Sequence, residues 1–192
     1  MIARRPLLLA LASSLLTACA TLPPPALPAR SELRNFALES RFALRATLPG
    51  QAPQSSGGRL SWSHQGSHDR ILLANPIGVG LAEIDATPLR SQLRTADGKE
   101  QESADPDALI EEATGLRLPV ARLPAWLLGR AGGSAQITAD PYGRPSRLHE
   151  NGWQVDYFYE DASPHALPSR LTISRPGEIE LKLRIEEWRE TP

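Results

Sequence analysis

The stretch IELKLRIE, residues 179–186, alternates apolar and charged side chains along its whole length. Successive side chains of a β-strand point to opposite faces of its sheet, so this alternation predicts a strand with one apolar and one charged face. The same period of two recurs in residues 42–48, 59–63 and 153–160. A chain patterned in this way is expected to consist mainly of strands that each bury one face.

Turn signals separate the predicted strands at short intervals. Asp97-Gly98 and Asn151-Gly152 are typical of two-residue hairpin turns, and Asn75-Pro76 ends the apolar run of residues 71–74. The segments between turns predict about ten or eleven strands. Strands joined almost entirely by tight turns favour one highly curved antiparallel sheet or an open barrel.

The period changes in the middle of the chain, where two short helices are expected. Asp105 can cap a helix that begins at Pro106 and ends before Gly115. A second helix is predicted at about residues 121–128, and Pro124 must lie in its first turn because proline has no N–H to donate. The expected fold class is therefore α+β, mainly β, with helices covering one side of the sheet.

The first residues have the features of an export signal. Arg4 and Arg5 provide a positive start, and residues 7–16 form an apolar segment that is too short to span a bilayer. The segment ends in Leu-Thr-Ala-Cys, which resembles the bacterial lipobox, where cleavage before the cysteine leaves it as a lipidated N-terminus. We therefore expect residues 1–18 to be a signal peptide and Cys19 to carry lipid. The alternative is an ordinary signal peptidase site with Cys19 as a bystander.

Removal of the signal leaves 192 − 18 = 174 residues, a length that suggests one domain. Residues 19–31 contain four prolines and are expected to form an extended tether, with residues 32–192 as the single folded domain. The composition, 41% hydrophobic and 22% charged, is that of a soluble globular domain. Without Arg4 and Arg5 the formal charge is 19 − 22 = −3, which disfavours nucleic-acid binding.

Motifs for enzymatic chemistry are missing from the sequence. It contains no G-x-S-x-G, H-E-x-x-H or G-x-x-x-x-G-K-[ST], so no nucleophile elbow, zinc-protease helix or phosphate loop is predicted. His64 and His68 are four residues apart, but Gly66 between them argues against the helix that such a metal site would need. Cys19 is the only cysteine, so no internal disulfide is possible. We expect no enzyme activity, no metal and no cofactor.

The remaining candidates for functional residues are apolar: four tryptophans and the isoleucine at position 77. Four tryptophans lie on or beside apolar segments, where each is either a core residue or the lining of an unfilled space. They are Trp62, Trp126, Trp153 and Trp188. Ile77 lies between Asn75-Pro76 and Gly78, at the tip of a turn-forming stretch that would normally face water.

Several segments together resemble the LolB family, the outer-membrane lipoprotein receptors that act last in the bacterial lipoprotein-localisation pathway. These segments are the lipobox ending at Cys19 and residues 60–62, 69–78, 118–129, 153–157 and 181–188. By this resemblance the fold is a half-open antiparallel β-barrel with a helical lid over an apolar cavity for acyl chains. The residues then expected to help line the cavity are Leu44, Trp62, Leu73, Trp126 and Trp153. Ile77 matches the apolar residue of a loop implicated in delivering cargo to the membrane.

The resemblance implies a function as well as a fold. The protein would accept lipoproteins from a periplasmic LolA-like carrier and insert them into the outer membrane, acting as a monomer anchored by lipid at the periplasmic face. Ala20, rather than Asp, follows Cys19, which suggests the outer membrane rather than inner-membrane retention. The alternative from another class is a structural or assembly lipoprotein whose apolar faces are simply core and which binds only protein partners.

Overall fold

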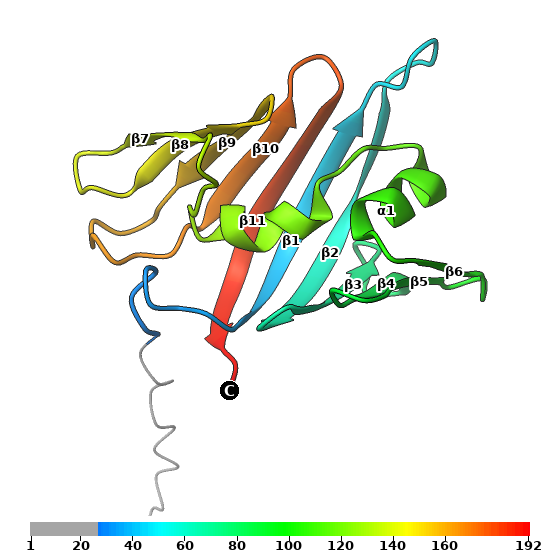
Figure 1. Ribbon diagram of the computed structural model, residues 1–192, viewed down its shortest axis with the longest axis horizontal. Coiled ribbons are helices and arrows are strands. Elements are labelled where there is room, and N and C mark those ends of the chain that lie inside the picture. The colour runs from blue at the N-terminus through cyan, green and yellow to red at the C-terminus, as the bar shows by residue number, and fades with distance from the viewer. Residues whose placement is uncertain (1–26) are drawn as a thin grey trace, which may run out of the picture.

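The computed structural model describes residues 27–192, which form an eleven-stranded antiparallel sheet crossed on one face by short helices (Figure 1). The predicted signal peptide, Cys19 and most of the tether lie outside the described residues. The strands are β1 (Phe36–Ala46), β2 (Gln54–Gln65), β3 (His68–Ala74), β4 (Gly80–Ala86), β5 (Ser91–Thr95), β6 (Glu100–Ser103), β7 (Gln136–Ala139), β8 (Pro145–Glu150), β9 (Trp153–Phe158), β10 (Arg170–Arg175) and β11 (Ile179–Glu190). The helices are α1 (Pro106–Thr114), the 3-10 turn η1 (Val120–Arg122) and α2 (Leu123–Leu127).

Strands β1 and β11, from opposite ends of the domain, pair at the centre of the sheet. The full order is β6-β5-β4-β3-β2-β1-β11-β10-β9-β8-β7. Within residues 27–192 the edge strands β6 and β7 do not pair with each other, so the sheet curves without closing into a barrel. This arrangement confirms the mainly β, antiparallel and unclosed fold predicted from the alternating pattern and the tight turns.

The alternation in the central strands produces one buried and one exposed face. Leu181 and Leu183 are buried, whereas Lys182 and Arg184 face solvent. Leu44 of β1 lies opposite Leu181 on the same side. Buried side chains of neighbouring strands join in one hydrophobic core on the face that the helices cover, here called the inner face. Removing this apolar surface from water favours the fold.

The helices form between β6 and β7, where the chain crosses from one edge of the sheet to the other. Asp105 caps α1 by accepting a hydrogen bond from the Asp107 amide at 2.9 Å, and Gly115 ends it with a φ of 72°. The single helix predicted near residues 121–128 is instead η1 followed by α2. Pro124 in the first turn of α2 cannot donate the hydrogen bond that would continue η1 as an α-helix. None of the helices in residues 27–192 is long and apolar enough to cross a bilayer.

Strands β1 and β2 begin earlier than the segments predicted from alternation, residues 42–48 and 59–63. They start at Phe36 and Gln54. The first half of β2 carries polar residues and glycine, so no apolar period marks it in the sequence. Gly58 is required there by close packing, because a Cβ at this position would lie 2.0 Å from the carbonyl oxygen of Ala74 on β3. The early part of β2 is therefore set by strand pairing rather than by burial of apolar side chains.

Candidate functional site

The five residues expected to line a cavity lie on the inner face of the sheet or on the helices that cover it. Three are buried and two are partly buried against the same core: Trp62, Trp126 and Trp153, then Leu44 and Leu73. Trp126 and Trp153 are neighbours, with ring centroids 6.0 Å apart. Trp62 packs against Phe36, with centroids 6.2 Å apart. The structure therefore brings all five into one hydrophobic cluster.

A cavity of about 450 Å³ opens at one end of the sheet, between the helices and the turns that join β2 to β3 and β4 to β5. Its apolar lining comes from both layers and includes Ala86, Pro88, Ala104, Pro124, Ala125 and Leu128. His64, Asp69 and Arg130 contribute polar atoms to the wall. This volume is typical of small-molecule sites, and the apolar part of the wall suits an alkyl chain.

A second cavity, of about 90 Å³, lies between β1, β2 and the segment after α1. Leu44, Leu48 and Leu116 contribute to its wall. Of the five predicted residues, Leu44 lines this smaller cavity and none lines the larger one. The physical reason is side-chain size. Large apolar residues fill the space they face, whereas alanine and proline leave space unfilled.

A buried carboxylate ties α2 to the sheet. The Glu150 side chain, at the end of β8, is 4% exposed and accepts hydrogen bonds at 2.7 Å from the Trp126 indole N–H and from the Arg122 guanidinium. Burial alone would raise the pKa of Glu150, but the hydrogen bonds from Trp126 and Arg122 outweigh burial and hold the pKa below its ordinary value. Sequence reasoning missed this residue. Its signal is an acidic side chain two residues after buried Leu148, at an inward-facing position that requires a buried partner.

The backbone of α2 is held from the same half of the sheet. Tyr157 of β9 donates its hydroxyl to the Trp126 carbonyl oxygen at 2.7 Å. Arg30, before β1, donates to the Leu128 carbonyl oxygen at 2.7 Å. Helix α1 packs instead against β5 and β6 at the other edge. The two helices are thus attached to opposite halves of the sheet.

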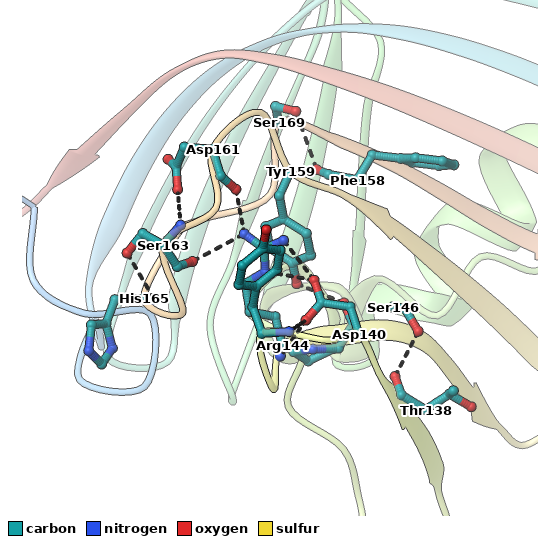
Figure 2. Close-up of polar contacts among 12 residues, drawn as sticks. Thr138, Asp140, Arg144, Ser146, Phe158, Tyr159, Asp161, Ser163, His165 and Ser169 are labelled. Carbon is teal, nitrogen blue, oxygen red and sulfur yellow. Dashed lines mark hydrogen bonds and ion pairs between the residues drawn. The ribbon is translucent and has the colours of Figure 1, made fainter.

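A second buried charge fixes the loops at the β7 edge. Arg144 donates to the Asp140 carboxylate at 2.8 Å and to the Ser163 carbonyl oxygen at 3.1 Å (Figure 2). Its guanidinium carbon lies 4.0 Å from the centroid of the Tyr159 ring, a cation–π contact. These contacts join the β7–β8 turn to the loop between β9 and β10. Figure 2 shows Phe158 pointing away from them.

The loop between β3 and β4 presents Ile77 to solvent. The Asn75 side-chain oxygen accepts hydrogen bonds from the backbone N–H groups of Ile77 at 3.1 Å and Val79 at 2.9 Å. Gly78 has a φ of 92°, a conformation that favours glycine. Ile77 is 84% exposed, and Val79 and Leu81 are exposed beside it. The loop is therefore ordered by its own hydrogen bonds while its apolar side chains face outward.

His64 and His68, whose spacing could suit a metal site on a helix, each contact a carboxylate rather than each other. His64 Nδ1 lies 2.8 Å from Asp69 Oδ1, and His68 Nε2 lies 3.0 Å from Asp85 Oδ1. Among residues 27–192, no group of three or more histidine, cysteine or acidic side chains is placed to hold a metal ion. The features that distinguish the described residues are a mainly apolar cavity between the helices and the strand turns, and a projecting apolar loop.

Known proteins are similar to this chain over nearly its whole length. Residues 34–188 match the family model for the outer membrane lipoprotein LolB. LolB of Dechloromonas aromatica is 66% identical over 184 residues, which cover 96% of this chain and 97% of the relative. LolB of Azoarcus sp. is 32% identical, over 92% of this chain and 91% of that relative. Among solved structures, a LolA superfamily protein from Nitrosomonas europaea superposes with a TM-score of 0.47 at 11% identity, covering 81% of this chain and 87% of that chain.

The chain therefore belongs to the LolB family of outer-membrane lipoproteins, which confirms the resemblance found in its sequence motifs. Its location is the outer membrane. Its role lies in lipoprotein localisation and is not enzymatic.

Proposed function

We propose that the protein accepts lipoproteins from a periplasmic LolA-like carrier and inserts them into the outer membrane, holding their acyl chains between the sheet and the helices. The observation that carries this proposal is the cavity of about 450 Å³ between the helices and the turns at one end of the sheet, next to a continuous hydrophobic core. Three acyl chains contain about 45 methylene groups, and exposing them at about 0.8 kcal/mol each would cost about 35 kcal/mol. Transfer therefore needs an apolar space that shields the chains from water.

Movement of α1 would enlarge that space. Helix α1 packs on the β5–β6 edge, whereas Glu150 and Tyr157 fasten α2 to β8 and β9. A shift of α1 away from the sheet would expose Leu44 and Leu73 to an incoming chain and leave α2 in place. The hydrophobic cluster that is packed without cargo would then become the wall that contacts the acyl chains.

The cavity opening and the Ile77 loop lie at opposite ends of β3. Gly66 and Ser67, just before β3, line the opening, and the loop follows Ala74 at the end of the strand. A strand of 7 residues spans about 23 Å. In the proposal, lipid on Cys19 anchors the chain through its tether, and the apolar loop holds one end of the domain at the bilayer while the carrier docks at the other. One chain supplies both ends, so we propose that it acts as a monomer.

The proposal is tested by following a lipoprotein from its carrier to this protein and then to liposomes. Ile77→Glu places a carboxylate where the loop would enter lipid. We expect this variant to accept cargo normally but to release it to liposomes roughly tenfold more slowly or worse. Ile77→Leu keeps the apolar side chain and should release cargo normally.

Leu89→Glu is the matched control, because Leu89 is 89% exposed in the β4–β5 turn at the end of β4 away from the Ile77 loop. It should leave release unchanged. Normal release by Ile77→Glu would remove the loop from the mechanism. Failure of the unsubstituted protein to accept cargo at all would instead favour a structural or assembly lipoprotein that binds only protein partners.

A further inference from the structure

Four arginines form a row across the outer face of the sheet, which is the face opposite the helices. Arg59 on β2 lies opposite Arg41 on β1, and Arg41 lies opposite Arg184 on β11. Arg184 in turn lies opposite Arg170 on β10. All four side chains are exposed. Adjacent strands are about 4.8 Å apart, so this arginine row is about 15 Å long.

The positive charge of the arginine row is largely unpaired. Arg41 forms an ion pair with Glu186, with a nitrogen–oxygen distance of 2.7 Å. Arg59, Arg170 and Arg184 form no ion pair with any other residue in the part of the chain that the structure describes. Like charges directly opposite each other on neighbouring strands repel. An anionic partner would relieve this repulsion.

The arginine row borders a shallow depression of about 370 Å³. Its polar wall includes Arg41, Arg170, Arg184, Lys182 and Thr172, and Phe158 adds an aromatic ring. Other acids of this face have cationic partners of their own: Glu180 lies 2.9 Å from Lys182, and Asp156 lies 2.6 Å from Arg147. Guanidinium groups match phosphate oxygens with paired hydrogen bonds, so the depression suits a phosphate group.

Exposed apolar side chains lie beside both ends of the arginine row. Arg59 lies opposite Ala74, the last residue before the Ile77 loop. Leu72, two residues earlier on β3, is 45% exposed on the outer face. At the other end, Phe158 is 47% exposed, and its ring centroid lies 5.3 Å from the Arg170 guanidinium carbon. Cations flanked by apolar groups fit a lipid surface, where phosphates lie just above the acyl chains.

We propose that the arginine row binds the phosphate groups of anionic phospholipids in the membrane that receives the cargo. This inference rests on the proposed function, because the row begins beside the Ile77 loop. Phospholipid on the outer face would hold that face against the bilayer next to the loop. The cavity opening, at the other end of β3 and on the inner side, would then lie farther from the membrane, where a carrier can reach it. An acidic protein segment would meet the cations but would gain little from the apolar ends.

The test measures how closely the outer face approaches a bilayer. The protein is purified from the membranes of cells expressing the full chain, so that any processing at Cys19 is retained. It is then incorporated into vesicles. Ser55→Cys, exposed on the outer face of β2 and four residues from Arg59, carries a fluorophore, and the lipids carry a head-group quencher. The protein without Ser55→Cys gives the background labelling.

We compare vesicles of phosphatidylcholine alone with vesicles that also contain phosphatidylglycerol. Quenching should be stronger with phosphatidylglycerol, and high salt should abolish the difference. The triple variant Arg59→Gln, Arg170→Gln and Arg184→Gln should lower the quenched-to-unquenched ratio by about tenfold in the anionic vesicles. The control triple variant Arg90→Gln, Arg94→Gln and Arg117→Gln makes the same change in net charge at exposed sites and should quench like the parent.

Equal quenching by the two triple variants, or by the parent in neutral and anionic vesicles, would overturn the proposal. Loss of carrier binding by the row variant without any change in lipid approach would also overturn it, because the partner would then be a protein. Urea unfolding checks that the row variant is folded, and the salt dependence of the parent tests the proposal without any substitution in the row. Cargo release by Ile77→Glu is scored separately, so failure of the loop assignment and failure of the lipid contact are distinguishable.

Discussion

Glu150 is an acidic side chain at a strand position where its neighbours are apolar. Its charge is kept in the core by donors from a different part of the chain: Trp126 and Arg122 approach from the helical segment. Removing one partner of a buried charge pair leaves the other without compensation. Glu150 therefore couples the position of α2 to the stability of the whole domain.

Glu150→Gln removes the charge while keeping nearly the same shape. We expect the free energy of unfolding at pH 7 to fall by about 2 kcal/mol, because charged hydrogen bonds are replaced by weaker or unfavourable ones. The native pKa of Glu150 is below the ordinary value of 4.5, so its contribution is present above that value and is lost as pH falls through the native pKa. Urea unfolding at several pH values should show the difference between variant and parent shrinking in acid. Glu112→Gln, exposed on α1, is the control, and an equal loss there would contradict the assignment.

At this scale the sequence predicts features that depend on local chemistry. The exposure of Ile77 follows from the turn residues on either side of it, and these are contiguous in the chain. The larger cavity could not be predicted in the same way. It forms where small residues from separate segments, such as Ala86 and Ala125, meet without filling the space. The tryptophans that the sequence predicts for the cavity wall are packed in the core, because their large side chains fill the space they face.

At the scale of the element, alternation identifies strands wherever one face is apolar, as in β11. It fails in the first half of β2, where pairing with β1 continues through polar residues and glycine. The sequence predicts a longer helix than α2, but Pro124 restricts it. The position of α2 depends on hydrogen bonds from distant strands. A periodic pattern within one segment cannot predict which distant strand that segment pairs with or packs against.

Gly58→Ala tests how tightly β2 approaches β3. The added methyl group would meet the Ala74 carbonyl oxygen at 2.0 Å, and that backbone atom can move only by disturbing the strand pair. We expect a loss of about 2 kcal/mol in unfolding free energy, measured in urea. Gly80→Ala, on β4, is the control because a Cβ there meets nothing within 4 Å. Equal stability of the two variants would show that β3 can shift without cost.

For the molecule as a whole, the decisive feature is that the strand order leaves β6 and β7 as separate edges, with the helices crossing between them. Hairpin signals predict the neighbours β5–β6 and β8–β9 but contain no information about the pairing of β1 with β11. That pairing joins the six-strand meander β1–β6 to the five-strand meander β7–β11 in one curved sheet and creates the inner face. The cavity opening and the Ile77 loop then lie at opposite ends of β3. Substitutions can therefore test acceptance of the acyl chains and release of the cargo separately.

Ala125→Trp should block the first of these steps. Ala125 lines the larger cavity, and an indole there would occupy much of the space available to an alkyl chain. We expect residues 27–192 to bind a fluorescent fatty acid saturably, and the variant to bind it about tenfold more weakly, because the chain would have to displace a packed ring. Ala108→Trp, on the exposed side of α1, is the matched control and should bind like the parent. Titration of fluorescence against protein concentration measures each affinity.

Because Ile77 is at the far end of β3, Ile77→Glu should leave this affinity unchanged. If Ala125→Trp bound normally, the acyl chains would have to enter elsewhere, for example beside the smaller cavity at Leu44.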